Sequence, residues 1–386
     1  MLIRLSETAG KNAGGKAGVL GVLLRRGLPV PDGFVVATDD VRIEPASERS
    51  LRDAVASELA RLGDPVVAVR SSAANEDTAD ASAAGQYQSI IGVRGIDDVY
   101  SAILSCLAST DTDRVAAYWT RTNGTDSRPP QRMAALVQAV IEADASGVMF
   151  TPQRPGESTR IEASWGLGPS MVDGTVTPDT YEVTSDGAVR YTIGSKQIRT
   201  DLNREHGGVT SNTVAPALQH ARALDDATVT TLAAFGGRIT RLFGRPQDIE
   251  WAVVRGAVWI LQARPITAHV PARRTASHAR GGALTGTPGS HGTAAATARI
   301  VRSPSEFSTV HTGEIVVCPY TDPAWTPLFS IAAGVVTETG GALSHAAIVA
   351  REYSIPAVLA VTDATNRIGN GAPIVIDGTA GTVTVQ

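Results

Sequence analysis

The segment around His345 has the most distinctive chemical pattern in the chain. Two glycines at 340 and 341 turn the chain between a predicted strand and a predicted helix that begins at His345, and Ser344 is placed to cap that helix. Unpaired N–H groups and the positive end of the helix dipole favour anions at such a position. An imidazole there can be a nucleophile toward a phosphoryl group, because the helix end stabilises the charge of the product. From these residues alone, a histidine that merely starts the helix is an equally good interpretation.

A second group of polar residues lies on a predicted hairpin. Two β-rich runs flank a short loop at Gly256, and a turn centred there pairs Glu250 with Gln262. The same register pairs Asp248 with Arg264, and alternation along the strands places all four side chains on one face. A carboxylate opposite an amide oxygen can hold Mg²⁺ against nucleotide phosphates. Taken alone, the hairpin favours the alternative, a solvated polar face.

Three further segments contain residues that suit phosphate binding, although each is weak evidence alone. Arg70 ends a predicted strand before two serines and a loop of small residues that extends to Gly85. Lys16 follows two glycines at a helix start, in a pattern that differs from the Walker motif. Gln138 interrupts an otherwise apolar run. Each of these residues could also be purely structural.

The elements that must position these residues alternate along the first two thirds of the chain. Amphipathic helices are predicted around residues 19–24, 99–107 and 232–242, where apolar residues recur at helical spacing. Strands are predicted at 33–36, 66–69, 87–93, 134–141, 147–150 and 181–184, and near 250 and 262. Interleaved strands and helices predict a layered α/β or α+β domain.

A second, smaller α/β unit is predicted at the C-terminal end. Its strands are expected at 298–301, 314–318, 334–336 and 357–360, its main helix at 345–353, and a closing strand pair at 373–377 and 382–385. Residues 268–287 are rich in Pro, Arg, Ser and Gly, as linkers are. The predicted boundaries are therefore 1–270 for the first domain, 271–284 for a linker or hinge, and 285–386 for the second domain.

Composition excludes several classes of protein. The 386 residues include 34 basic and 38 acidic side chains, a net charge of −4, and 43% hydrophobic residues, which fits a folded globular protein. No basic tract suggests nucleic acid as a partner, no apolar run has the ~18–20 residues of a membrane helix, and the N-terminus has no signal-peptide core. The two cysteines are far apart, so neither a disulfide framework nor a zinc site is expected. We therefore expect a cytoplasmic protein without nucleic-acid or membrane partners.

Taken in order, these segments resemble the PEP synthase and pyruvate phosphate dikinase family. The matching text covers nearly the whole chain, and its most specific blocks are ILQARPIT and GGALSHAAIVAREYSIPAV. The resemblance implies an ATP-grasp-type nucleotide-binding domain followed by a small swivelling β/β/α phosphohistidine domain. It also implies a phosphotransferase in which a histidine takes the β-phosphate of ATP, with release of AMP and inorganic phosphate, and then passes the phosphoryl group on.

Residue by residue, the resemblance makes His345 the phosphorylated histidine. The positions that match the family's nucleotide site are Lys16, Arg70, Gly85, Ser89, Gln138, Glu250, Gln262 and Arg264. The three cationic members would neutralise phosphate charge, and Gln138 would lie at the adenine or its hinge strand. Glu250 and Gln262 would hold Mg²⁺, in agreement with the register of the hairpin.

The phosphoryl acceptor is left open by the resemblance. No PEP/pyruvate barrel is expected after His345, and no large insert is expected between the two domains, unlike in the rifampin phosphotransferase relatives. One hypothesis is an enzyme that phosphorylates a small molecule in specialised metabolism or antibiotic modification, or uses the phosphoryl group for a condensation. A second is a phosphocarrier subunit whose acceptor site lies on a partner protein. The third, a paralogue that binds ATP without turnover, is opposed by the intact set of site residues.

Overall fold

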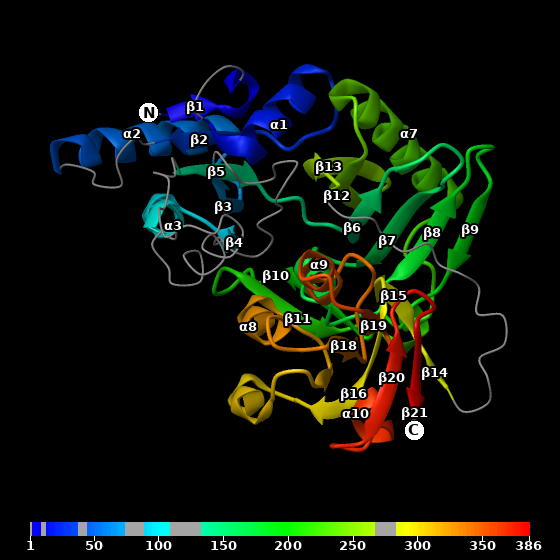
Figure 1. Cartoon of the computed structure of the whole chain (residues 1–386). Helices are drawn as coiled ribbons and strands as arrows, with labels where there is room; N and C mark the ends of the chain where they lie inside the picture. The colour runs from blue at the N-terminus through cyan, green and yellow to red at the C-terminus, as the bar shows by residue number, and fades with distance from the viewer. Residues whose placement is uncertain (1, 9–12, 38–44, 74–88, 109–132, 267–282) are drawn as a thin grey trace.

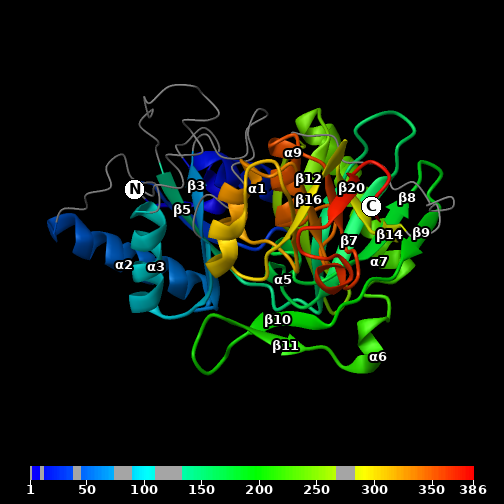
Figure 2. The ribbon, with the colours of Figure 1, turned by 60° about the horizontal axis from the view of Figure 1, so that its bottom comes forward.

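The computed structural model describes the chain apart from residues 1, 9–12, 38–44, 74–88, 109–132 and 267–282. Most of its described strands belong to three sheets, two before the predicted linker and one after it (Figure 1). The two ends of the chain lie on opposite sides of the molecule in both views (Figures 1 and 2). The expected α/β class is confirmed.

The first sheet is antiparallel throughout and has the strand order β1-β2-β5-β3-β4. Its strands are β1 (Leu2–Arg4), β2 (Gly33–Ala37), β3 (Val67–Ala73), β4 (Ser89–Val93) and β5 (Met133–Ala139). The helices are α1 (Gly14–Arg25), α2 (Pro45–Leu62) and α3 (Ile96–Ala108), and a 3-10 turn spans Leu5–Glu7. Apolar residues of α2 and α3 pack on one face of the sheet, and those of α1 pack on the other. The face of the sheet that carries α1 is therefore the face that contacts the second sheet.

The second sheet is also antiparallel, with the order β13-β12-β6-β7-β8-β9. Its strands are β6 (Ala145–Phe150), β7 (Thr159–Trp165), β8 (Asp179–Val183), β9 (Val189–Thr192), β12 (Gln247–Val254) and β13 (Ala257–Pro265). Helix α7 (Asp226–Phe243) covers one face, where its apolar residues share a core with α1 and with the buried Trp251. The shared core joins the two sheets into one body.

A separate hairpin and two short helices complete this first part. The hairpin consists of β10 (Ile198–Leu202) and β11 (Val209–Thr213), and the short helices are α5 (Pro169–Val172) and α6 (Pro216–Gln219). Figure 2 shows the hairpin below the second sheet. The tip of the hairpin reaches the first sheet, where the Gly208 amide donates to the Gly92 carbonyl at 2.9 Å.

The third sheet is mixed, with the order β14-β21-β20-β16-β17-β18-β19-β15. Its strands are β14 (Leu284–Thr285), β15 (Thr287–Ser290), β16 (Thr293–Ile300), β17 (Ile315–Cys318), β18 (Gly334–Thr337), β19 (Ala357–Leu359), β20 (Pro373–Asp377) and β21 (Thr382–Val385). The helices are α8 (Thr326–Phe329), α9 (His345–Glu352) and α10 (Ala364–Arg367), with 3-10 turns at Pro304–Thr309 and Pro323–Trp325. Strands β16 to β19 are parallel neighbours, and separate apolar clusters cover the two faces.

The expected strands and helices of the last unit correspond to β16 to β21 and α9, whereas several elements of the first part were not predicted. Helix α2, strand β7 and the β10–β11 hairpin are the largest of these. Strand β7 does alternate polar residues (Arg160, Glu162 and Ser164) with apolar ones (Ile161, Ala163 and Trp165), so this strand was visible in the sequence although its polar residues are buried. The β10–β11 hairpin is largely polar, which gives little periodic signal. Both described cysteines are buried and free, as expected.

Candidate functional site

The β12–β13 hairpin brings its polar residues together in the expected register. Glu250 faces Gln262, and Asp248 faces Arg264. The expected centre of the turn is wrong, because the loop is the two-residue turn Arg255–Gly256, in which both residues have positive φ. Between Glu250 and Trp251 the register shifts by one residue, which leaves Leu261 as a bulge. The bulge compensates for the shorter loop and restores the predicted pairs at the site.

Arg70 lies between the two proposed metal ligands. Its Nη2 donates to Glu250 Oε2 at 2.9 Å and to Gln262 Oε1 at 2.7 Å. Its Nη1 donates to the carbonyl oxygen of the bulged Leu261 at 3.2 Å. Strand β3 and the hairpin belong to different sheets, so this guanidinium links the two lobes of the first part. The two side-chain oxygens converge on a single cationic group.

Positively charged side chains lie around the Glu250 carboxylate and lower its pKa. Burial alone would raise the pKa of this carboxyl group, but the positive charges of Arg70, Arg264 and Lys16 outweigh burial and hold its pKa below the usual value. Arg264 is also paired through Nε with Asp248 Oδ2 at 2.8 Å. Three of the predicted phosphate-neutralising cations therefore surround one carboxylate, as a site for a polyanion with a metal ion requires.

Lys16 owes its position to a close contact between α1 and the end of β3. The Ser72 hydroxyl donates to the Ala13 carbonyl at 2.8 Å and accepts the Ala17 amide at 3.1 Å. Gly14 has φ +76°, and a Cβ there would lie 1.9 Å from the Ser72 carbonyl oxygen. Only glycine fits this close approach. The approach places the start of α1, where Lys16 lies, beside β3, where Arg70 lies.

The remaining predicted nucleotide-site residues differ in how far the structure describes them. Ser89 on β4 is exposed and lies directly opposite Arg70 on β3. Gln138 is buried, and its Nε2 donates to the Pro31 carbonyl at 2.9 Å. It occupies the strand next to Arg70 and faces Ala68 in the ladder. Gly85 lies outside the described residues.

His345 begins helix α9, as predicted, and its side chain is 5% exposed. Nδ1 lies 2.9 Å from Thr321 Oγ1, Nε2 lies 3.4 Å from Thr326 Oγ1, and the ring meets that of Phe329 edge-on. The expected side-chain cap is wrong, because the Ser344 hydroxyl donates to the Gly341 carbonyl at 2.9 Å. Ser344 therefore stabilises the loop before the helix instead of the first turn of the helix.

Glu162 on β7 is a functional candidate that the sequence reasoning missed. Its Oε1 accepts the Ala342 amide at 3.0 Å and its Oε2 accepts the Leu343 amide at 3.3 Å, although more than 170 residues separate them in the chain. The carboxylate also pairs with Arg160. A Cβ on Gly341 would lie 2.2 Å from Glu162 Oε2, so this glycine leaves room for the carboxylate. A signal in the sequence was the alternation of polar and apolar residues over 160–165, which predicts a strand with Glu162 on its polar face.

One row across the second sheet connects this contact with the proposed metal ligands. Gln262, Glu250, Val148 and Glu162 are successive partners on neighbouring antiparallel strands, so their side chains lie on one face. At about 4.8 Å per strand, Glu162 is roughly 10 Å from Glu250. The loop that precedes His345 therefore lies on the same face as the cationic cluster, and Figure 1 shows α9 beneath this sheet.

Other contacts hold the loop in this docked arrangement. The Thr339 hydroxyl donates to the Gly174 carbonyl at 2.6 Å, and the Gly340 amide donates to the Val176 carbonyl at 3.1 Å. Leu343 packs in a small apolar cluster with residues of β6 and the 171–176 segment. Burial, followed by the negative charge of Asp322, raises the pKa of Asp173 to about 6. Two carboxyl groups, one from each part, therefore oppose each other at the edge of this interface.

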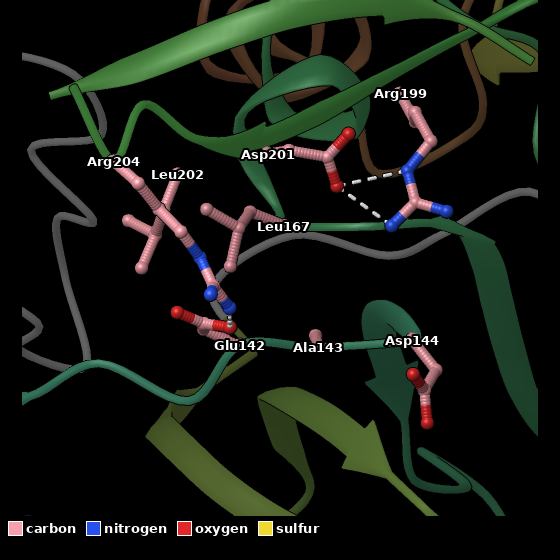
Figure 3. A pocket seen from close by; sticks show the side chains of 8 residues that line it. All are labelled: Glu142, Ala143, Asp144, Leu167, Arg199, Asp201, Leu202 and Arg204. Atoms are coloured by element: carbon pink, nitrogen blue, oxygen red, sulfur yellow. Dashed lines mark hydrogen bonds and ion pairs between the residues drawn. The ribbon is translucent and has the colours of Figure 1, made fainter.

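Two pockets lie beside the β10–β11 hairpin. The smaller, about 230 Å³, is shown in Figure 3, where Arg204 extends toward Glu142 and Arg199 pairs with Asp201. The larger, about 740 Å³, shares Glu142 and Arg204 and reaches β4 and α3. None of the predicted site residues lines the described walls of either pocket. Within the described part of the chain, no group of three or more His, Cys, Asp or Glu could bind a metal by itself, and no helix could span a membrane.

Comparison with known proteins identifies the family. The model for the pyruvate phosphate dikinase AMP/ATP-binding domain matches residues 40–281, and the model for the mobile domain of PEP-utilising enzymes matches residues 310–381. The chain belongs to the PEP synthase and pyruvate phosphate dikinase family. Residues 40–281 include Arg70, Glu250, Gln262 and Arg264, and residues 310–381 include His345, whereas Lys16 precedes the first matched range.

Curated relatives extend this family assignment along the chain. A probable phosphoenolpyruvate synthase of Methanothermobacter thermautotrophicus is 34% identical over 96% of this chain and 61% of its own length. Phosphoenolpyruvate synthase of Escherichia coli is 35% identical over 87% of this chain and 45% of its own length. The chain thus spans about half the length of these relatives. An acetyl-coenzyme A synthetase structure from Ca. Korarchaeum cryptofilum, 11% identical, matches 66% of this chain and 93% of its own at a TM-score of 0.33, too low to support any conclusion.

Proposed function

We propose that this chain is a dikinase-type phosphotransferase in which His345 takes the β-phosphoryl group of ATP. The observation that supports this most directly is that the loop 339–344, which precedes His345, docks on the sheet face that also carries Glu250 and Gln262. Formation of phosphohistidine, AMP and inorganic phosphate breaks both anhydride bonds of ATP and consumes one water molecule. The nucleophile and the cations needed for such a transfer belong to different domains, which this arrangement brings together.

The cationic residues would bind and orient the phosphate chain. Arg70 and Arg264 carry planar guanidinium groups that suit phosphate oxygens, and Lys16 adds a point charge near Glu250. Electrostatic stabilisation of the transferred group is the main contribution a protein makes to phosphoryl transfer. The family resemblance alone assigns three further residues to the proposed nucleotide site, Gln138, Ser89 and Gly85.

The residues present fit a bound Mg²⁺. Glu250 and Gln262 offer one carboxylate and one amide oxygen that already converge on a cation, the Arg70 guanidinium. Mg²⁺ commonly takes one or two protein oxygens and completes its shell with water and phosphate, so a larger cluster of acidic residues is not required. When bound, the metal would neutralise charge on the phosphates. Arg70 would then be free to donate to phosphate oxygens instead of to Glu250.

Isotope labelling tests the proposal. With Mg²⁺ and ATP labelled with ³²P in the β position, the protein should take up an acid-labile, alkali-stable label, and His345→Ala should abolish it. Glu250→Ala should also remove the label while leaving the far-ultraviolet circular dichroism unchanged. Glu205→Ala is the control, since Glu205 is exposed and is not a member of the cluster. Retention of label from γ-labelled ATP on the protein would contradict the β-phosphoryl route.

The acceptor is proposed to be a small molecule that meets His345 in a different arrangement of the domains. In the docked arrangement the loop before His345 lies against the sheet face that carries Glu250, which is the proposed place of the nucleotide and not of the acceptor. The mobile domain must therefore leave the sheet face before transfer. Release of AMP should depend on the acceptor added, and a screen of candidate hydroxy and carboxylic acids by AMP release would identify it. Turnover that appears only with a second protein would indicate the phosphocarrier alternative.

A further inference from the structure

Arg351 lies in the last turn of α9, and its side chain reaches back along the helix toward the first turn. Its Nη1 donates to the Ala342 carbonyl and to the Gly289 carbonyl, both at 2.8 Å. Side chains of an α-helix lean toward its N-terminus, so a long side chain in the last turn of a short helix can contact the loop before it. The guanidinium thereby holds the loop 339–344 to strand β15.

The peptide group between Ala342 and Leu343 connects Arg351 with Glu162. Its carbonyl oxygen accepts from Arg351, and its N–H donates to Glu162 Oε2 at 3.3 Å. A cationic donor at one end of a peptide group and a carboxylate at the other polarise the group in the same sense, which strengthens both hydrogen bonds. Arg351 is therefore linked, through one peptide group, to the carboxylate on which the loop docks.

Arg351 also lies near a second row of charged residues on the sheet. This row is two residues along each strand from the row that contains Glu250 and Glu162, so both rows lie on the same face. Its successive members are Arg264, Asp248, Phe150 and Arg160. The charges that act on Arg351 belong to both rows, namely Asp248, Glu162, Arg160 and Arg264. Burial lowers the pKa of Arg351 to about 10, which leaves the guanidinium charged at neutral pH.

Positive charge exceeds negative charge at this face when the mobile domain is docked. The main electrostatic effects on Glu250 and Arg351 come from two further carboxylates, Asp248 and Glu162, and from four further cations, Lys16, Arg70, Arg160 and Arg264. Among these groups, five positive charges face three negative charges. Glu250 and Asp248 lie about 7 Å apart along one strand, within the range of about 10 Å over which charges interact in 0.1 M salt. A polyanion beside Glu250 would therefore act on Arg351 and offset the excess of positive charge.

We propose, resting on the phosphotransfer function above, that Arg351 is a positioning residue that makes docking of the mobile domain depend on the charge bound in the nucleotide site. Arg351 is close to the bound phosphates in the docked state alone. ATP then binds the docked state more tightly than the undocked state, and by reciprocity it stabilises docking. AMP, which carries less negative charge, stabilises docking less. Departure of His345 from the sheet face therefore becomes easier after the β- and γ-phosphates have left the site.

Hydrogen–deuterium exchange of the full chain tests the role of Arg351, with Mg²⁺ and α,β-methylene-ATP as the probe because this analogue cannot release AMP. The measured quantity is the protection ratio, the exchange rate of peptides 339–345 without the analogue divided by the rate at saturation. The wild-type ratio should be about tenfold, near the low end of typical couplings between sites. Arg351→Gln removes the charge and should bring the ratio to within about twofold of one. Arg351→Lys keeps the charge without the planar fork, so it should exchange faster than wild type in the absence of analogue but retain most of the protection ratio.

Arg367→Gln is the matched control, because Arg367 is exposed in the last turn of α10 and donates to a carbonyl within the mobile domain. This variant should keep the wild-type protection ratio. If Arg351 only shaped the loop, its loss would speed exchange equally with and without the analogue. A tenfold ratio in Arg351→Gln therefore overturns the proposal, as does a wild-type ratio of one with the analogue bound. If Arg351→Gln also speeds exchange of β17, the domain has unfolded, and Arg351→Lys decides: a retained ratio supports the proposal and a lost ratio overturns it.

Labelling of the wild type with β-³²P-ATP separates this inference from the proposed function. Protein that binds the analogue and protects 339–345 in the manner described, but takes no label, refutes the phosphotransfer and leaves the role of Arg351 intact. Label on His345 together with a wild-type protection ratio in Arg351→Gln refutes the role of Arg351 and leaves the phosphotransfer intact. Absence of any calorimetric binding of the analogue to the wild type refutes both.

Discussion

Replacement of Glu162 by glutamine should loosen the docking of the mobile domain. The carboxylate is 1% exposed and accepts two backbone amides from the loop before His345, at 3.0 and 3.3 Å. A hydrogen bond to a charged group contributes about 1.5–3 kcal/mol and a neutral one about 0.5–1.5 kcal/mol. Glutamine keeps one acceptor oxygen, so one of the two bonds becomes neutral and the other is lost, which together cost about 2.5–4.5 kcal/mol, or roughly 70- to 2000-fold in the docking equilibrium.

Hydrogen–deuterium exchange measures this effect without nucleotide. In Glu162→Gln, peptides that cover 339–345 should exchange roughly 70- to 2000-fold faster, because the Ala342 and Leu343 amides are released whenever the domain undocks. Peptides from the 173–178 segment, which contains the carbonyl partners of Thr339 and Gly340, should speed up together with them. Peptides from β17 should not change, since that strand lies within the core of the mobile domain.

The matched control is Glu205→Gln, whose carboxylate is exposed. It should leave all three groups of peptides at their wild-type rates. If Glu162→Gln exchanges within about threefold of wild type at 339–345, the carboxylate contributes little to docking. If β17 speeds up equally, the variant unfolds the domain, and the reasoning about a docking contact is refuted.

Three further substitutions test other parts of the site. Gly341→Ala places a Cβ 2.2 Å from Glu162 Oε2 and should reproduce the exchange pattern of Glu162→Gln, whereas Gly369→Ala, whose nearest neighbour is at 3.7 Å, should not. In Asp173→Asn, the gain in thermal midpoint over wild type should increase from about pH 4 to pH 6 and then level off. The folded pKa of Asp173, about 6, exceeds its unfolded value, so ionisation opposes folding across that range. The pH dependence of Glu250 has the opposite sign, because its pKa is lowered in the folded protein. The stability that its charge contributes should be constant above about pH 4.5 and lost at lower pH. Urea midpoints of the wild type and of Glu250→Gln, compared across this range, measure that contribution.

The local geometry of the site was largely accessible from the sequence, since period-two alternation and a glycine-containing turn fix which hairpin residues share a face. The bulge at Leu261 was not accessible, because it is set by packing of Ile260 and Ala263 into the core on both sides of it. The role of Ser344 was also missed, because the hydroxyl can bond either to the helix or to the preceding loop and only the folded loop decides.

Glu162 shows why the docking contact could not be predicted. Its partners are backbone amides, which every residue possesses, so no particular residue type at 342 or 343 indicates the contact. The pairing depends on how two domains meet across more than 170 residues of chain. The glycine at 341 was visible in the sequence but had two possible explanations, a turn or a close approach. Gly340, with φ +103°, is the residue the turn requires, and Gly341 provides the space.

The composition of the interface favours reversible docking. Among the described residues, the contact includes backbone groups, the Glu162 carboxylate, the Thr339 hydroxyl and an apolar cluster of five buried residues, and Arg351 of the mobile part interacts electrostatically with Asp248 and Glu162. Each part has its own larger apolar cores, which docking leaves untouched. Undocking therefore breaks these interface contacts and leaves the larger cores intact. Because Glu162 and Glu250 lie in one row of the sheet, binding of a polyanion and metal beside Glu250 alters the field at the docking carboxylate. Occupancy of the nucleotide site should thereby influence whether His345 stays or leaves.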